Sequence, residues 1–197
     1  MSHAKREGWS LPEFLDWERG QDRRYELVDG EALLMAGGTQ AHALIAANLV
    51  AVLRPFLRGT PCRPSGSDLR IPIPSTGNLR YPDVTIDCGR FDPASHDASD
   101  PRIVFEVLSQ STGWYDQTRK LRDYEAVSSI HQYICVSQSE ARVSIWLRDG
   151  EHRFKAQDDV LDGAIALALG EAMPMIWLRQ IYEGLPFMAP PSEVEGV

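Results

Sequence analysis

Residues 102–108 read Arg-Ile-Val-Phe-Glu-Val-Leu and are almost wholly apolar apart from Glu106. Such a run is typical of a central strand that is covered on both faces of its sheet. Residues 81–88 alternate in polarity and predict a second strand. We expect the two strands to be neighbours, so that Asp83, at the start of the second strand, lies near Glu106.

The remaining elements are arranged around these two strands. Ser10 predicts the start of a helix that ends near Gly20, and further helices are expected at residues 41–57, 111–127 and 175–182. Strands are expected at residues 24–28, 31–35, 68–73, 131–136, 142–147, 152–156 and 165–169. The order predicts an α/β (α+β) fold, a mixed sheet flanked by helices.

Length and composition favour one globular domain. The chain has 197 residues, of which 43% are hydrophobic and 24% charged. We expect a single domain at residues 1–185 and a loosely ordered tail at residues 186–197. The longest apolar runs are short and the first residues are polar, so we expect no transmembrane helix, no signal peptide and a cytoplasmic location.

The net charge of −8 argues against a protein that coats nucleic acid by bulk electrostatics. The segment from residue 54 to residue 80 nevertheless contains only one acidic residue, Asp68, and five arginines. The arginines are Arg54, Arg58, Arg63, Arg70 and Arg80. This segment predicts a phosphate-binding patch. The alternative is a solvated surface with scattered arginines.

The cysteines do not form a recognisable motif. Cys62, Cys88 and Cys135 are an odd number with wide spacing and no CxxC pair, which argues against a zinc ribbon and a disulfide framework. Cys88 and Cys135 lie in apolar, strand-like runs. We expect both to be buried thiols.

The carboxylates of Asp83 and Glu106 are the first candidates for chemistry. A buried carboxylate costs several kcal/mol unless it is paired or binds a cation. Two carboxylates on neighbouring strands suit Mg²⁺, which prefers oxygen ligands. The alternative is that Glu106 pairs with a buried arginine and Asp83 caps a turn.

The helix after the central strand carries a regular polar face. Thr112, Asp116, Lys120 and Tyr124 recur every four residues, a spacing that places them on one face. Because this helix directly follows the strand, Lys120 could reach back toward Glu106. The alternative is a surface pair between Asp116 and Lys120.

The ordered set of these motifs resembles the PD-(D/E)XK nuclease superfamily, and more closely its Uma-type branch of restriction-endonuclease-like proteins. The motifs are Tyr81-Pro-Asp83, Val104-Phe-Glu-Val-Leu-Ser109, Ser111-Thr112 with Asp116, Lys120 and Tyr124, the opening hairpin at residues 24–31, His42, and Tyr133-Ile-Cys-Val136. The similarity extends over residues 11–182. It implies a restriction-endonuclease-like mixed sheet flanked by helices.

One position departs from the superfamily pattern. The superfamily has a lysine two residues after the strand glutamate, where this chain has Leu108. The resemblance implies that Lys120 on the following helix takes its place. It also suggests Glu31 as a third acid and His42 as a substrate-binding residue. Their alternatives are a turn-flanking glutamate and a helix-start or packing histidine.

Together these features predict a metal-dependent endodeoxyribonuclease. Asp83 and Glu106 would bind Mg²⁺ or Mn²⁺, Lys120 would act on the water or the phosphate, and the arginine-rich segment would bind DNA. A homodimer would suit cleavage of both strands. One alternative is a nuclease-fold module that binds nucleic acid or a protein and has lost catalysis, and another is a metal hydrolase for a small phosphorylated substrate.

Overall fold

The main sheet of the computed structural model has six strands. The structure describes residues 8–35, 37–108, 114–170 and 173–188. The strand order is β10 (Phe154–Ala156), β9 (Val143–Arg148), β8 (Gln132–Ser137), β7 (Pro101–Leu108), β6 (Val84–Asp87) and β3 (Arg63–Gly66). β7 and β8 are parallel and the other neighbours are antiparallel. The predicted pairing of the two central strands is confirmed, since Val84 lies opposite Phe105.

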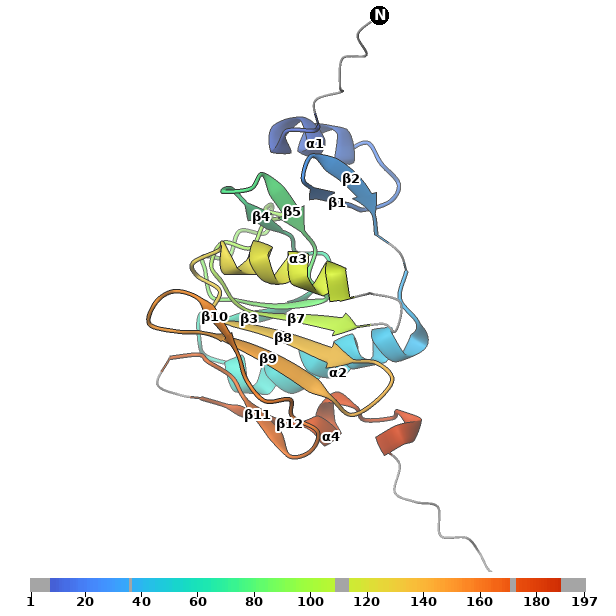
Figure 1. Cartoon of the computed structure of the whole chain (residues 1–197), viewed down its shortest axis with the longest axis vertical. Helices are drawn as coiled ribbons and strands as arrows, with labels where there is room; N and C mark the ends of the chain where they lie inside the picture. Colours follow the sequence, from blue (N-terminus) through green and yellow to red (C-terminus); the bar gives the residue numbers. More distant parts are fainter. Residues whose placement is uncertain (1–7, 36, 109–113, 171–172, 189–197) are drawn as a thin grey trace, which may run out of the picture.

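Helices cover both faces of this sheet, with α2 (Gln40–Leu57) on one face and α3 (Trp114–Glu125) on the other (Figure 1). Ile103, Phe105 and Val107 belong to the core cluster on the α2 face, whereas Val104 packs with Tyr124 on the α3 face. Strand alternation therefore turns Glu106 toward α3. The prediction that β7 is covered on both faces is confirmed.

The apolar side of α2 serves this core. The helix is long and apolar enough to cross a membrane by length and composition alone. Ile45, Leu49, Leu53 and Leu57 are buried against the main sheet. A core helix of this kind is therefore weak evidence for a membrane span.

A second, four-stranded sheet lies at the N-terminal end of the molecule (Figure 1). Its order is β2 (Glu31–Leu34), β1 (Tyr25–Val28), β5 (Asn78–Arg80) and β4 (Ile71–Ile73), and α1 (Leu11–Glu18) packs beside it. Phe14, Leu27, Leu79 and Tyr81 form a small core there. The chain passes from β5 of this sheet into β6 of the main sheet, so Asp83 lies at the junction of the two sheets.

The C-terminal part extends the core below α2. It contains β11 (Ala164–Ala166), β12 (Met175–Trp177), α4 (Leu178–Ile181) and the 3-10 turn η1 (Pro186–Met188). The single helix predicted at residues 175–182 is wrong in its first half, where β12 pairs with β11. Of the predicted loose tail, residues 186–188 are ordered and residues 189–197 lie outside the described residues.

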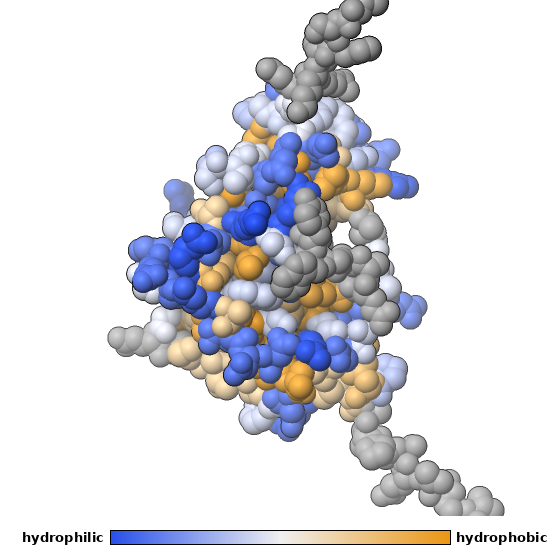
Figure 2. Space-filling model, in the orientation of Figure 1, coloured by the Kyte–Doolittle hydropathy of each residue, from blue (hydrophilic) through white to orange (hydrophobic). Residues whose placement is uncertain are grey.

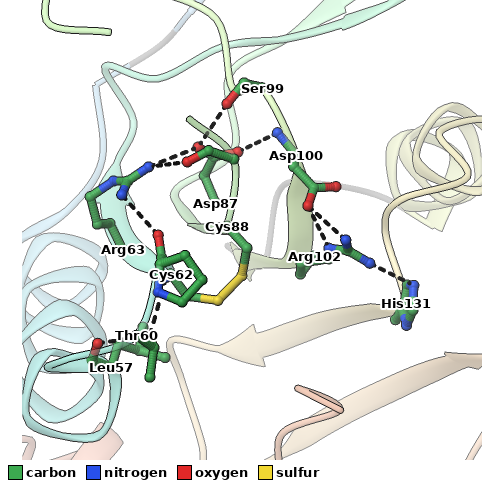
Figure 3. The surroundings of a disulfide bond; sticks show 12 residues. Leu57, Thr60, Cys62, Arg63, Asp87, Cys88, Ser99, Asp100, Arg102 and His131 are labelled. Carbon is green, nitrogen blue, oxygen red and sulfur yellow. Dashed lines mark hydrogen bonds and ion pairs between the residues drawn. A yellow bond between two sulfur atoms is a disulfide. The ribbon is translucent and has the colours of Figure 1, made fainter. Parts of the chain in front are cut away.

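The cysteine prediction is corrected at one position. Cys62 and Cys88 form a disulfide (Figure 3). Cys135 is a buried thiol. The antiparallel pairing of Arg63 with Asp87 places the preceding and following cysteines opposite each other. This register could not be predicted, because no strand was expected at the position of β3.

Candidate active site

A pocket of about 430 Å³ opens where the two sheets meet α3. Its lining includes Glu26 from β1, His42 from the first turn of α2, Asp83 from the junction, Glu106 from β7 and Lys120 from α3. These five side chains thus come from four elements and from the junction between the two sheets. Four of the five residues are those that the sequence singled out, and Glu26 is the addition.

Glu106 is buried at the floor of this pocket, with 4% of its surface exposed. Its Oε2 accepts a hydrogen bond from Lys120 Nζ at 2.9 Å, and its Oε1 accepts one from the Tyr124 hydroxyl at 2.6 Å. Burial raises the pKa of Glu106 to about 7, and nearby Asp83 adds to the rise while Lys120 opposes it. The four-residue spacing of Lys120 and Tyr124 does place both on the face toward Glu106, and the alternative of a buried arginine partner is not what the structure shows.

Asp83 is held by two partners. Its Oδ2 accepts a hydrogen bond from the Val107 backbone N–H at 2.7 Å, and its Oδ1 lies 3.1 Å from His42 Nε2. The hydrogen bond to Asp83 raises the pKa of His42. His42 also donates its backbone N–H to Thr39 Oγ1 at the start of α2. It is therefore both a helix-start residue and a pocket residue, and it orients Asp83.

Glu26 takes the place expected for Glu31. Glu26 Oε1 lies 3.9 Å from Lys120 Nζ and accepts the Tyr81 backbone N–H at 3.1 Å. Glu31 is exposed at the start of β2, opposite Val28, and is outside the pocket lining. The third-acid prediction is corrected accordingly. A charge within the apolar run of residues 25–28 is the signal that would have found Glu26, as it found Glu106.

The predicted arginine patch does not form one surface. Arg80 is only 1% exposed and pairs with Glu26 and Asp123 at 2.8 and 2.7 Å, so it is not available to DNA. Both carboxylates raise the pKa of Arg80 against the opposing effect of burial. Arg70 pairs with Glu18 at 3.3 Å and is largely buried. Both assignments are corrected, because the two arginines serve ion pairs within the protein, Arg70 with Glu18 and Asp97 and Arg80 with Glu26 and Asp123.

The other three arginines remain accessible. Arg54 and Arg58 are exposed at the end of α2, and Arg63 is half-buried beside Asp87 at 3.8 Å. Arg63 also lies over the ring of Phe91, with 5.3 Å between guanidinium carbon and ring centroid. Of the five arginines predicted to bind phosphate, these three are the accessible ones.

The donor set of the pocket fits a hard divalent cation. Within the described ranges, no group of three or more His, Cys, Asp and Glu side chains is arranged as a complete metal centre. Asp83 and Glu106 nevertheless offer carboxylate oxygens, and Mg²⁺ is commonly held by one or two carboxylates together with water and substrate phosphate. Three acids share the pocket with one lysine and one histidine. A divalent cation would offset this excess of negative charge.

Comparisons with known proteins bear on the family to which the chain belongs. The family model Uma2, described as putative restriction endonuclease, matches residues 11–179. Two uncharacterised proteins of Synechocystis are similar, one 31% identical with 90% of this chain and 93% of the relative covered, the other 26% identical with 72% and 82% covered.

A solved structure has the same fold. A putative nuclease belonging to DUF820 from Anabaena variabilis superposes with a TM-score of 0.70 at 12% identity, covering 88% of this chain and 97% of that one. At this identity the likeness concerns the fold alone. With the family match extending over most of the sequence and the nuclease-like fold, the chain belongs to the Uma2 family of restriction-endonuclease-like proteins, the Uma-type branch of the PD-(D/E)XK superfamily.

Proposed function

We propose that this protein is a metal-dependent endonuclease that hydrolyses phosphodiester bonds in DNA. The observation that carries the proposal is the contact of Lys120 Nζ with Glu106 Oε2 at 2.9 Å, inside the pocket that also contains Asp83. A cation beside two carboxylates, open to a ligand, is the set of groups that phosphodiester hydrolysis needs.

Asp83 and Glu106 would hold Mg²⁺ or Mn²⁺, with the backbone carbonyl of Val107 as a further ligand. When bound, such an ion lowers the pKa of water and offsets charge on the phosphate. His42 fixes the carboxylate of Asp83 through its contact at 3.1 Å. Tyr124 fixes Glu106 from the opposite side at 2.6 Å.

Lys120 would position the attacking water and stabilise the charge that develops on the phosphate. The superfamily lysine comes from the strand, whereas Lys120 comes from α3. This difference is acceptable, because the ammonium group has only to reach the reacting atoms with the right geometry. Glu26, 3.9 Å from the same ammonium group, would help to orient it.

The substrate side of the proposal rests on charge. Arg54, Arg58 and Arg63 would contact the sugar–phosphate backbone, since exposed arginines bind phosphate oxygens. A homodimer would place two such sites on a duplex. A cytoplasmic location remains part of the proposal.

Nicking of supercoiled plasmid over time tests the activity. The wild-type protein should convert plasmid to the open-circular form in Mg²⁺ or Mn²⁺, and Glu106→Gln should serve as the inactive blank. If the wild type nicks no faster than this blank in either metal, the proposal that the protein cleaves DNA is wrong. Plasmid binding without nicking would then favour the non-catalytic binding module, and release of phosphate from nucleotides would favour the small-substrate hydrolase.

A further inference from the structure

Leucine side chains stand beside the acids of the pocket. Leu33 on β2 lies directly opposite Glu26 on β1, and residues opposite each other in an antiparallel pair share one face of the sheet. Leu108 follows Glu106 by two residues on β7, so it shares the face of Glu106. Both leucines line the pocket, as does Leu34. The polar floor therefore has an apolar wall.

Among the described residues, packing does not account for Leu33 and Leu34 of this wall, whereas Leu108 packs partly against the core cluster on the α3 face. Leu33 is 40% exposed and Leu34 is 48% exposed, whereas Ala32 and Met35 of the same segment pack on the small N-terminal core. Figure 2 shows hydrophobic side chains gathered over the β1–β2 hairpin. Exposed apolar groups that rim a polar pocket mark a ligand contact.

The ligand must combine a charged part with an apolar face. The acids and Lys120 select a phosphate with its cation, but the pocket of about 430 Å³ is in the range that holds a drug-sized molecule. A nucleobase supplies a flat apolar face and a polar edge. Gln117 and Gln138 line the same pocket and carry amide groups that can hydrogen-bond to such an edge.

Resting on the proposed function, we propose that Leu33, Leu34 and Leu108 contact the base next to the scissile phosphate. A base inside a duplex has its faces covered by stacking, so only an unstacked base can lie on this wall. The substrate class is therefore single-stranded or locally opened DNA. Leucine is among the apolar side chains that proteins insert at unstacked base steps.

Fluorescence anisotropy with two labelled single strands of equal length tests this inference. One strand carries bases and the other has abasic sugars throughout, so both present the same phosphates. The full-length protein is titrated with each strand in Ca²⁺, and a gel checks that the strands stay intact. We expect about tenfold tighter binding of the base-bearing strand, from apolar surface buried on the leucines.

Variants assign the preference to the wall. Leu33→Ser should weaken binding of the base-bearing strand alone, so that the two affinities differ by no more than about twofold. Leu33→Phe should retain the wild-type preference. The matched control is Leu161→Ser, at a leucine that is 57% exposed and outside the pocket lining. It should keep the wild-type preference.

The inference is wrong if the wild type binds both strands equally or binds neither, or if Leu33→Ser weakens both strands in proportion. Because binding is measured without cleavage, its result is separate from the nicking assay. A protein that prefers the base-bearing strand but nicks no plasmid would keep the base contact and lose the proposed catalysis. A protein that nicks plasmid but binds both strands equally would keep the proposed catalysis and lose the base contact.

Discussion

Two clusters of buried charge lie next to each other in this molecule and share Glu26. In the first, Arg80 pairs with Glu26 and Asp123, and Asn78 donates to Asp123 Oδ1 at 2.8 Å. In the second, Lys120 and Tyr124 contact Glu106, and His42 contacts Asp83. The first is enclosed by protein, whereas the second lines an open pocket.

The difference shows that burial of charge does not by itself mark a functional site. Around Arg80 the nearby carboxylates raise its pKa, so the charged form is favoured in place. Around Glu106 burial raises the pKa of the acid to about 7, so its charged form is disfavoured even with the Lys120 ammonium group beside it. The enclosed cluster ties β1, β5 and α3 together, and the open one is left short of positive charge.

The largest effect is expected at the enclosed cluster. Arg80→Met leaves Glu26 and Asp123 buried without their cation, and we expect it to lower the free energy of unfolding by about 3–5 kcal/mol. Urea denaturation measures this loss. Arg54→Met, at an exposed arginine on the same protein, should change stability by less than about 0.5 kcal/mol. Equal stability of Arg80→Met and wild type would show that the two clusters do not differ in this way.

Lys120→Ala tests the open cluster through turnover. We expect nicking to slow by about 100-fold or more, because the ammonium group acts mainly on charge that develops in the transition state. Affinity for DNA should change far less. Lys155→Ala removes a lysine that pairs with Asp149 on the surface and should cut as fast as wild type. If Lys120→Ala also cuts at the wild-type rate, the helix lysine has no catalytic role.

A divalent metal is expected to bind the open cluster and not the enclosed one, and the melting temperature measures this binding. Mg²⁺ or Mn²⁺ at saturating concentration should raise the Tm by several degrees, about 2–3 kcal/mol by linkage. Asp83→Asn should abolish this rise. Asp158→Asn, at an exposed acid, should retain it. A rise of the same size in both variants would place the ion elsewhere.

The smallest expected effect is a pH dependence of the metal-free protein. The pKa of Glu106 is raised from 4.5 to about 7 in the folded state. Protonated Glu106 therefore favours folding below its unfolded pKa, and this contribution is lost as the pH rises through about 7. The Tm in EDTA should fall by a few degrees over this range, and Glu106→Gln should flatten the curve. A wild-type curve that already matches the variant would contradict the raised pKa.

The sequence predicts the parts of the fold and site that depend on local pattern. The continuous apolar run at residues 102–108 identifies β7, and the charged Glu106 within that run identifies the site. Helix periodicity places Lys120 and Tyr124 on one face, and the distances to Glu106 agree.

The rest depends on contacts between distant segments. The Cys62–Cys88 bond requires the register of β3, a strand with Pro64 and little apolar character. Arg80 looked like a surface arginine because its partners, Glu26 and Asp123, are 54 and 43 residues away. No local pattern reports such a pairing.

The lysine on α3 has a mechanical consequence. The two carboxylates are attached to the strands of the sheet, whereas the ammonium group is attached to a helix that packs through its own Tyr124 on Tyr133 and Ile130. A lysine two residues after the glutamate on the same strand would have a position fixed by the strand backbone. Here the distance between Lys120 and Glu106 is set by the packing of α3 on the sheet. The rate of such an enzyme is therefore adjustable from positions that never touch the substrate, since a shift of about 1 Å can cost 100-fold in rate.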